Sequence, residues 1–190
     1  MSAFLASVDP WRPRGIEVRV RSVGSTPTAH VMSSADGITE IRPGNYVFYD
    51  ATQVALGIVP LERCALSVLT TVISRPAPDR LIIDAGSKAL AAERLTTLLA
   101  GFGQVVGHPE LTVARLYEEQ GIVTSAGPCG IPVGARLGVV PNHSCVAANL
   151  HDRMLVQDGG AVVDVWPVAF RGWRSLRGEP ELADHAAVDH

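Results

Sequence analysis

The sequence predicts a mainly β protein, built as a β-barrel or sandwich with one or two short helices. Gly and Pro occur 18 and 13 times in 190 residues, and they divide the chain into short apolar runs. Most of these runs have the length and the β-branched residues of strands, and only one has a helical pattern. Many short strands at close spacing are typical of all-β domains.

The first strands are expected in the N-terminal third. Residues 16–21 alternate between apolar and charged side chains, as a half-buried strand does. A loop of Gly, Ser, Thr and Pro follows at residues 24–28. Residues 38–41 and 46–49 are expected to form two further short strands, since β-branched and aromatic residues favour this conformation.

The middle of the chain alternates strands with one helix. Residues 61–74 become rich in β-branched residues toward their end, and residues 80–84 form a short apolar run. After a Gly-containing turn, residues 88–99 have the pattern of a short helix. Residues 111–117 are expected to form a strand, followed by a polar turn at residues 118–121.

The last strands surround a hairpin signal. Residues 135–140 lead into the segment Pro141-Asn142-His143-Ser144-Cys145, which is also interpreted as extended. Residues 153–157 and 161–165 flank Asp-Gly-Gly, which favours a tight β-hairpin. The residues after Trp173 are polar and lack periodicity, so they are expected to form a loose tail.

Composition excludes several classes of protein. The chain is 47% hydrophobic and 18% charged, so a fully disordered protein is not expected. Its net charge is −3 and it has no long basic run, which argues against nucleic acid or a membrane as partner. It has no apolar stretch of membrane-spanning length. Pro10 and Pro13 interrupt the region where a signal peptide needs an apolar core, so a cytoplasmic protein is expected.

Two counts limit the chemistry. The three cysteines (Cys64, Cys129 and Cys145) are few and odd in number, which indicates separate thiols rather than a disulfide framework. Lys88 is the only lysine among the 16 basic residues, so it is the one side-chain amine that could form a Schiff base. The alternative is an ordinary solvated residue of a helix.

His143 and Cys145 are candidate metal ligands. If the segment is a strand, residues two apart point to the same face and can bind one ion. Imidazole and thiolate together suit Zn²⁺ better than Mg²⁺ or Ca²⁺. With two protein ligands, the remaining positions would be open to water or substrate, as in catalytic zinc sites. The alternative is a buried Cys beside a hydrogen-bonded His.

Gly24, Ser25 and Thr26 are candidate ligands of a phosphate group. A strand that ends in Gly and hydroxyl residues offers free backbone amides and side-chain donors to a dianion. The alternative is an ordinary turn. Six further polar residues near strand ends could face a site or be ordinary surface residues: Tyr46, Tyr49, Asp50, His108, His151 and Asp152.

Five segments occur in an order that resembles a known family. They are the loop at 24–28, the run Glu-Ile-Arg-Pro-Gly-Asn-Tyr-Val-Phe-Tyr-Asp at 40–50, Asp-Ala-Gly-Ser-Lys-Ala-Leu at 84–90, Pro-Asn-His-Ser-Cys at 141–145, and the Asp-Val-Trp-Pro-Val to Arg-Gly region at 164–172. Together they resemble the C-terminal part of the D-serine dehydratase / D-threonine aldolase family. The resemblance covers about residues 14–173.

The resemblance implies an architecture and a domain division. These enzymes bind pyridoxal phosphate and have the alanine-racemase fold, in which a TIM-like barrel precedes a β-domain. Residues 1–35 would then be a remnant of the end of the barrel, including the phosphate loop. Residues 36–173 would be the β-domain with the metal site, and residues 174–190 a loose polar tail.

The resemblance also implies a chemistry. Gly24, Ser25 and Thr26 would hold the phosphate of pyridoxal phosphate, and His143 and Cys145 would bind Zn²⁺. In this family the metal polarises the β-hydroxyl of a D-amino acid while the cofactor stabilises the α-carbanion, which leads to loss of water or to carbon–carbon cleavage. Cys145 favours the dehydratase branch, because the aldolase branch resembles His-x-Asp here.

The sequence departs from the family at two places. The Schiff-base lysine of full-length members lies near their N-terminus, and Lys88 does not match it, so no catalytic residue is assigned. Gln120 stands where the family has the His of a Glu-Glu-His-Gly run. The chain is therefore expected to be the C-terminal portion of a D-amino-acid lyase, inactive alone, whether as a fragment, half of a split enzyme or the product of a mis-started gene.

A non-catalytic alternative is a metal-binding β-domain that forms a homodimer or docks on a full-length relative or barrel-bearing chain. In a further alternative, His143 and Cys145 are vestigial.

Overall fold

The computed structural model describes residues 13–94, 98–169 and 171. Its contacts divide the chain into two units, Met1–Ala147 and Ala148–His190, which are described separately. The predicted tail at 174–190 lies outside the described residues. The division into 1–35, 36–173 and 174–190 stays a prediction.

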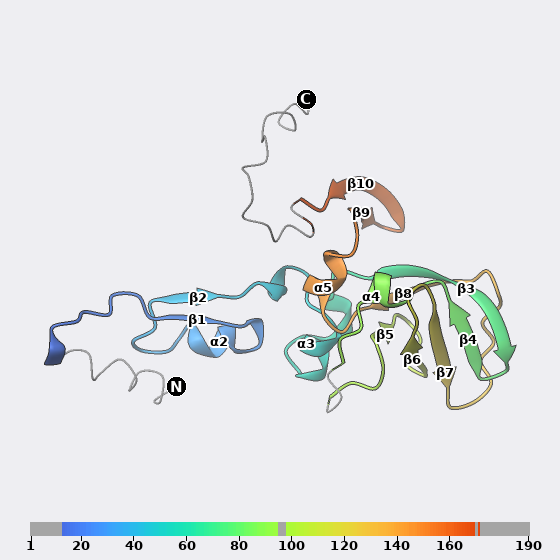
Figure 1. Cartoon of the computed structure of the whole chain (residues 1–190), viewed down its shortest axis with the longest axis horizontal. Helices are drawn as coiled ribbons and strands as arrows, with labels where there is room; N and C mark the ends of the chain where they lie inside the picture. Colours follow the sequence, from blue (N-terminus) through green and yellow to red (C-terminus); the bar gives the residue numbers. More distant parts are fainter. Residues whose placement is uncertain (1–12, 95–97, 170, 172–190) are drawn as a thin grey trace, which may run out of the picture. The chain divides into compact units, whose positions relative to one another are not determined.

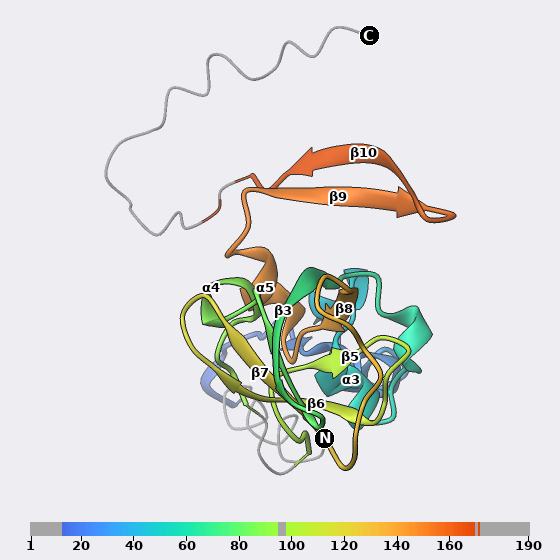
Figure 2. The same cartoon turned by 90° about the vertical axis from the view of Figure 1, so that its right-hand side faces the viewer.

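The first unit contains a closed barrel of six antiparallel strands, in the order β3-β4-β7-β6-β5-β8 (Figures 1 and 2). The strands are β3 (Val68–Ala77), β4 (Arg80–Ile83), β5 (Gln104–Val105), β6 (Leu111–Leu116), β7 (Gly121–Ser125) and β8 (Arg136–Val140). Closure pairs β3 with β8, where Val68 lies opposite Val139. The predicted mainly β fold is thus confirmed as a barrel, in which every strand has two neighbours.

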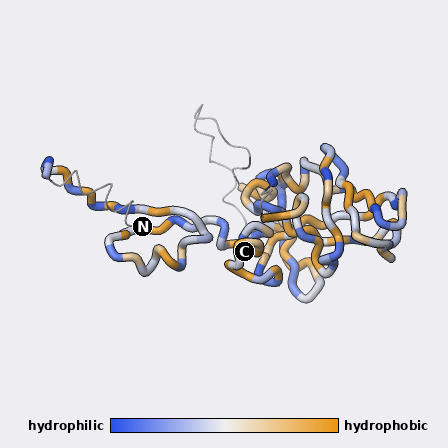
Figure 3. The backbone as a smooth tube through the Cα atoms, turned by 90° about the horizontal axis from the view of Figure 1, so that it is seen from below, coloured by the Kyte–Doolittle hydropathy of each residue, from blue (hydrophilic) through white to orange (hydrophobic). Residues whose placement is uncertain are grey.

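Alternation along the strands builds the barrel core. Leu81 and Ile83 of β4 are fully buried while Arg80 is exposed, and Val113 and Val123 repeat the pattern on β6 and β7. Hydrophobic and hydrophilic positions alternate along the tube in this region (Figure 3). The inward side chains form one apolar cluster, which closure of the barrel removes from water.

A separate pair of parallel strands precedes the barrel. β1 (Ser22–Gly24) lies beside β2 (Glu40–Arg42), with Gly24 opposite Arg42. The connection contains the short helices η2 (Thr26–Thr28) and α2 (Ala29–Met32). This is a strand–helix–strand unit, the connection that parallel strands require. Within the described residues, no third strand pairs with either edge.

The remaining helices of the first unit are single turns. They are η3 (Asn45–Val47), α3 (Ala51–Ala55), η4 (Leu61–Arg63), α4 (Ser87–Leu90) and α5 (Ser144–Ala148). Among the residues that the structure describes, no helix has the length and apolar character needed to span a membrane.

Three local predictions are wrong. Residues 16–21 are not a strand, since β1 begins only at Ser22. Residues 46–49 form a helical turn instead of a strand, because the Phe48 and Tyr49 amides both donate to the Asn45 carbonyl. The predicted helix at 88–99 is shorter, since α4 ends where Ala91 adopts φ 63. Strands β5 and β7 were not predicted: β5 is only 2 residues long, and β7 begins at Gly121, which was assigned to the preceding turn.

The second unit contains an antiparallel hairpin of β9 (Arg153–Asp158) and β10 (Ala161–Pro167). Its two-residue loop is Gly159-Gly160, with φ values of 55° and 88°. Two positive φ angles define the tight turn that matches strand twist, and glycine adopts them without strain. The hairpin prediction is therefore confirmed.

The Gly86→Ala variant is expected to be strongly destabilised. A Cβ at Gly86 would lie 2.4 Å from the carbonyl oxygens of both Tyr117 and Glu118, so the backbone would have to shift. We expect a loss of about 2 to 3 kcal/mol in the free energy of unfolding, measured by urea titration. Gly127→Ala is the matched control, since a Cβ there meets nothing within 4 Å. Equal stability of the two variants would contradict the prediction.

Candidate metal centre

The segment that carries His143 is fixed at the end of β8. The Pro141 carbonyl accepts from the Ala51 amide at 3.0 Å, and the Asn142 carbonyl accepts from the Thr52 hydroxyl at 2.6 Å. On the other side, the Asn142 side-chain amide donates to the carbonyls of Glu93 and Gly101, both at 2.9 Å. The segment is thereby held to the start of α3 and to the loop before β5.

Asp50 is the centre of the polar contacts around His143. Its side chain is fully buried at the start of α3, and its Oδ1 accepts from the Gln53 amide at 3.1 Å. Its Oδ2 lies 3.1 Å from His143 Nδ1 and accepts from the Ser144 amide at 3.0 Å and from the Asn45 side-chain amide. One carboxylate thus caps a helix and holds the imidazole.

Asp50 and His143 shift each other's pKa. Burial raises the pKa of Asp50, but the hydrogen bonds from His143, Asn45 and two backbone amides outweigh it, so the net pKa is below the ordinary value. The pKa of His143 is raised, mainly by its hydrogen bond to Asp50 and against the effect of burial. Both shifts follow from attraction between a carboxylate and an imidazole.

The ring of His143 has one nitrogen engaged and one available. Nδ1 faces Asp50, and the side chain is 38% exposed although Asp50 is not exposed at all. Metal-ligating histidines commonly donate their other ring N–H to a carboxylate, which fixes the ring orientation. The contact with Asp50 therefore leaves Nε2 as the ring nitrogen that could bind a metal.

Cys145 lies in the first turn of α5 and is exposed. The interpretation of residues 141–145 as extended is wrong, because the Ala147 amide donates to the His143 carbonyl and starts a helix. The argument that two residues in a strand share one face therefore does not apply. The two donors lie instead on either side of a helix start, with the Cys145 thiol accessible to solvent.

The donor chemistry of this site fits Zn²⁺, with an imidazole nitrogen, an accessible thiol and open positions for water or substrate. No group of three or more His, Cys, Asp or Glu side chains within residues 13–94, 98–169 and 171 is placed to hold a metal ion. In the same described part, the buried side-chain atoms without a hydrogen-bond partner all belong to this region: Asn45 Oδ1, Gln53 Oε1, Asn142 Oδ1 and Ser144 Oγ. Such a concentration marks a polar interior that water or a ligand would satisfy.

The predicted phosphate loop has an unusual backbone and a neighbouring cation. Ser25 adopts φ 102, a strained value for a residue with a side chain. Thr26 is buried, and its hydroxyl accepts from the Tyr46 amide at 3.2 Å. A Cβ at Gly24 would lie 3.7 Å from the guanidinium of Arg42, which the sequence analysis did not single out. A hydroxyl-rich loop beside a guanidinium fits an anionic phosphate.

Contacts connect this loop to His143. Thr26 binds the Tyr46 backbone, and the preceding Asn45 donates to Asp50, which holds His143. The two predicted sites are more than a hundred residues apart in sequence. Neither composition nor spacing indicates that they are joined through Asp50 and Asn45.

Lys88 has the surroundings of a surface residue. Its Nζ lies 3.2 Å from a carboxylate oxygen of Glu118 and 2.6 Å from one of Glu119. The hydrogen bond to Glu119, followed by that to Glu118, raises the pKa of Lys88. A Schiff-base lysine needs a lowered pKa, so the solvated-helix alternative is confirmed. Gln120, in the same turn, is exposed.

Cys64 is a protonated thiol near the site. Burial raises its pKa to about 11, and the negative charges of Asp50 and Glu62 add to the effect. A thiol that resists ionisation is a poor metal ligand, since the thiolate is the binding form.

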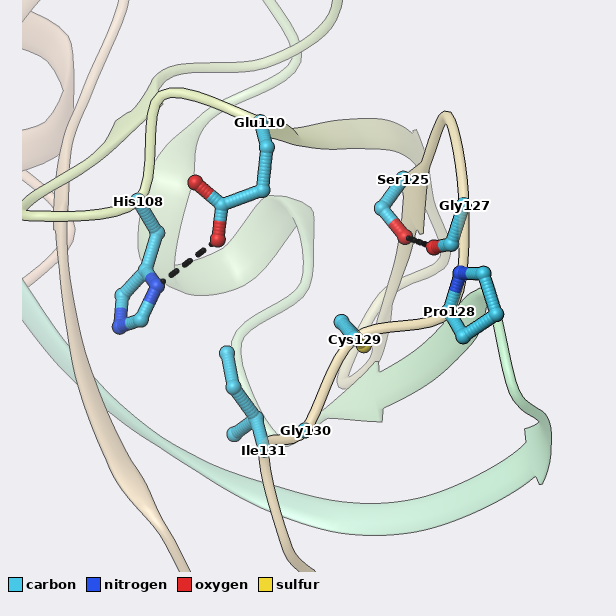
Figure 4. A pocket seen from close by; sticks show the side chains of 8 residues that line it. All are labelled: His108, Glu110, Ser125, Gly127, Pro128, Cys129, Gly130 and Ile131. Atoms are coloured by element: carbon cyan, nitrogen blue, oxygen red, sulfur yellow. Dashed lines mark hydrogen bonds and ion pairs between the residues drawn. The ribbon is translucent and has the colours of Figure 1, made fainter.

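A hollow of about 420 Å³ lies away from the predicted ligands (Figure 4). His108 is on its wall, 3.0 Å from a carboxylate oxygen of Glu110. Its lining also includes the buried Cys129, but no predicted metal or phosphate residue. Of the remaining candidates, Tyr49 directly precedes Asp50 at φ 54, and Asp152 pairs with Arg171 at 2.8 Å in the second unit.

Sequence comparison with known proteins finds a matching family and several related proteins. The family described as "Putative serine dehydratase domain" matches residues 65–157. D-threonine aldolase of Arthrobacter sp is 36% identical over 166 residues, which are 85% of this chain and 42% of that protein. The protein Rv1414 of Mycobacterium tuberculosis is 37% identical over 128 residues, which are 65% of this chain and 96% of that protein.

A solved structure agrees with the sequence relatives. The structure of D-threo-3-hydroxyaspartate dehydratase from Delftia sp. HT23 superposes with a TM-score of 0.76 at 33% identity, over 87% of this chain and 48% of that chain. Solved variants of that enzyme replace a histidine by alanine and, in a metal-free form, the cysteine two positions later by alanine.

The chain thus spans about half the length of these full-length enzymes, and nearly all of the shorter mycobacterial relative. The sequence identity, the matched domain and the superposition lead to the same group of proteins. The chain belongs to the D-serine dehydratase / D-threonine aldolase family and corresponds to the C-terminal domain of its full-length members.

Proposed function

We propose that this chain is the C-terminal, metal-bearing portion of a pyridoxal-phosphate and metal-dependent D-amino-acid lyase, in which His143 and Cys145 bind Zn²⁺. The observation that carries the proposal is the contact of Asp50 with His143 Nδ1, because it leaves Nε2 for a metal. A histidine and a cysteine with this same spacing are each replaced by alanine in solved variants of D-threo-3-hydroxyaspartate dehydratase, the second variant in a metal-free form.

The phosphate loop supports the cofactor half of the proposal. Gly24, Ser25 and Thr26 would hold the phosphate, beside the guanidinium of Arg42, which also pairs with Glu40 at 3.5 Å. When bound, the cofactor supplies an electron sink at the α-carbon and the metal a Lewis acid for a β-hydroxyl. A D-amino acid with a β-hydroxyl is therefore the proposed substrate, and the reaction is D-serine dehydratase-like or D-threonine aldolase-like.

The parallel strands β1 and β2 support the proposal that this chain carries the end of a TIM-like barrel. β1 and β2 form a strand–helix–strand unit whose edges have no strand partner in the described residues. Parallel strands occur almost only within larger covered sheets, so we interpret this unit as the end of a TIM-like barrel. Lys88, the only lysine, is exposed and paired with Glu118 and Glu119, so it is not proposed as the Schiff-base amine. The isolated chain is accordingly proposed to be inactive.

A second candidate is a non-catalytic metal-binding β-domain, which dimerises or docks on a barrel-bearing chain. It is favoured by the mycobacterial relative, 96% of which is covered by this chain, because a domain of similar size occurs there as a separate protein. In this case the metal would serve structure or docking, and no lyase activity would arise in any combination.

Cobalt substitution tests the metal site. We expect the metal-free chain to bind Co²⁺ and to show the thiolate-to-cobalt charge-transfer absorption of a cysteine ligand. Cys145→Ser should lose this absorption, whereas the control Cys129→Ser should keep it, because Cys129 is buried in the wall of the separate hollow. Unchanged spectra in Cys145→Ser, or no cobalt binding, would disprove the assignment of ligands.

A reconstitution distinguishes the two functions. The chain alone with pyridoxal phosphate and D-serine is expected to form no pyruvate. Coexpression with the N-terminal half of a full-length relative should restore pyruvate formation or aldolase activity if the chain is a lyase portion. Complex formation without any activity on D-serine, D-threonine or 3-hydroxy-D-aspartate would favour the docking domain. Pyruvate formed by the chain alone would contradict the proposed inactivity.

A further inference from the structure

We propose that Asp50 is the positioning residue of the metal centre. It holds the imidazole of His143 in the tautomer that carries its proton on Nδ1, so that the lone pair of Nε2 is directed to the ion. The inference deepens the proposed function and rests on His143 being a ligand. It assigns Asp50 no direct contact with metal or substrate.

The carboxylate can only accept a hydrogen bond. His143 Nδ1 lies 3.1 Å from Asp50 Oδ2 and 3.4 Å from the side-chain nitrogen of Asn45. The Asn45 amide donates to Asp50 Oδ2, so the closer contact, with the carboxylate, places the proton of a neutral imidazole on Nδ1. The tautomer of a histidine is set by the hydrogen bond that one of its nitrogens makes. The opposite tautomer would place two lone pairs against each other and leave a protonated Nε2, which cannot bind a metal.

The carboxylate is itself held in place. Its Oδ1 accepts from the Gln53 amide in α3, and its Oδ2 accepts from the Ser144 amide, directly after the ligand. Asn45 donates from a third side. Since Asp50 is 0% exposed, these contacts are shielded from bulk solvent. Asp50 therefore constrains both the ring of His143 and the backbone that follows it.

A purely structural role predicts a different outcome. If Asp50 acted only as the cap of α3, its loss would lower stability and leave the imidazole free to adopt either tautomer without effect on metal affinity. The tautomer of His143 and the zinc affinity are therefore the measurements that separate the two roles.

The first experiment uses the metal-free chain labelled with ¹⁵N-histidine. Two-bond ¹⁵N–¹H correlation spectra, recorded at a pH where His143 is neutral, report which ring nitrogen carries the proton. His143→Gln identifies the signals among the six histidines. We expect Nδ1 of His143 to be protonated in the wild-type chain. A protonated Nε2 would overturn the inference, and this measurement needs no variant of Asp50 to fold.

The second experiment compares two carboxylate variants. Asp50→Asn should give a mixture of tautomers and weaken zinc binding by about 10- to 100-fold, measured by competition with a chromogenic chelator. Asp84→Asn is the control, since Asp84 also accepts from a hydroxyl and an amide, those of Thr70 and Thr71, but lies outside the site. Equal zinc affinity in a folded Asp50→Asn variant would overturn the inference.

The results also separate this inference from the proposed function. An Nδ1-protonated His143 in a chain that binds no zinc would support the role of Asp50 in fixing the ring, and it would contradict the metal site. Zinc bound with unchanged affinity in Asp50→Asn would support the metal site and overturn the inference.

Discussion

Replacing Asp50 with alanine is expected to lower the free energy of unfolding by about 3 to 5 kcal/mol, which is a large share of the stability of a small domain. The fully buried carboxylate accepts from the Gln53 and Ser144 amides and from the side chain of Asn45, and it pairs with His143. Alanine leaves these donors without their acceptor in a largely buried region. It also removes the cap of α3.

The effect of Asp50→Ala should depend on pH in a defined way. Because the folded-state pKa of Asp50 lies below its ordinary 3.8, its ionic contribution is present above that value and is lost as the pH falls below it. Because the folded-state pKa of His143 lies above 6.5, the contribution of its charge is complete below 6.5 and is lost as the pH rises through the raised value. The difference from wild type should therefore be largest between these limits.

Urea titrations from pH 3 to pH 9 measure this difference. Glu118→Ala serves as the control, since its ion pair with Lys88 is exposed and contributes little. A stability difference below about 1 kcal/mol at pH 5.5 would show that water or neighbouring groups replace the carboxylate.

The His143→Gln variant is expected to lose at least about 100-fold in zinc affinity, because it removes one of only two proposed protein ligands. Glutamine keeps a hydrogen-bonding group near Asp50, so the fold should be affected less than by alanine. His108→Gln is the matched control, since His108 lines the separate hollow and pairs with Glu110.

The pH dependence of binding gives an independent check. Zinc competes with the proton on His143, whose pKa is raised, so wild-type affinity should fall by an additional factor of about ten per pH unit once the pH drops below that pKa. His143→Gln should lack this additional dependence. An identical pH profile in both proteins, measured by chelator competition, would exclude His143 as a ligand.

Strands β3, β4, β6 and β8 and the hairpin could be predicted from the sequence, whereas β5 and β7 could not. Short apolar or β-branched runs, such as those in Arg80–Ile83 and Leu111–Leu116, favour strands. The turn Gly159-Gly160 could also be predicted, because glycine is the residue that most readily adopts two positive φ angles in succession. These patterns involve only neighbouring residues, so they predict local structure without knowledge of the fold. The family was also recognisable from five ordered motifs.

Only the tertiary structure decided the conformation of the segments around the site. Residues 46–49 have strand-forming side chains, yet they turn so that Asn45 reaches Asp50 and Tyr46 reaches Thr26. The His143 segment begins a helix because its neighbours are held by α3 and by the loop before β5. Strand propensity contributes less free energy than several buried hydrogen bonds. The hydrogen bonds therefore decide the backbone conformation at these positions.

The role of Asp50 was decided in the same way. In the sequence it is one of several polar residues near an expected strand end, with no periodicity or spacing that connects it to His143. The fold buries it completely and places its carboxylate 3.1 Å from the imidazole, 93 residues further along the chain. The sequence thus determined which side chains could bind a metal, and the tertiary structure decided which nitrogen is available, because hydrogen bonds between distant residues form only when the chain is folded.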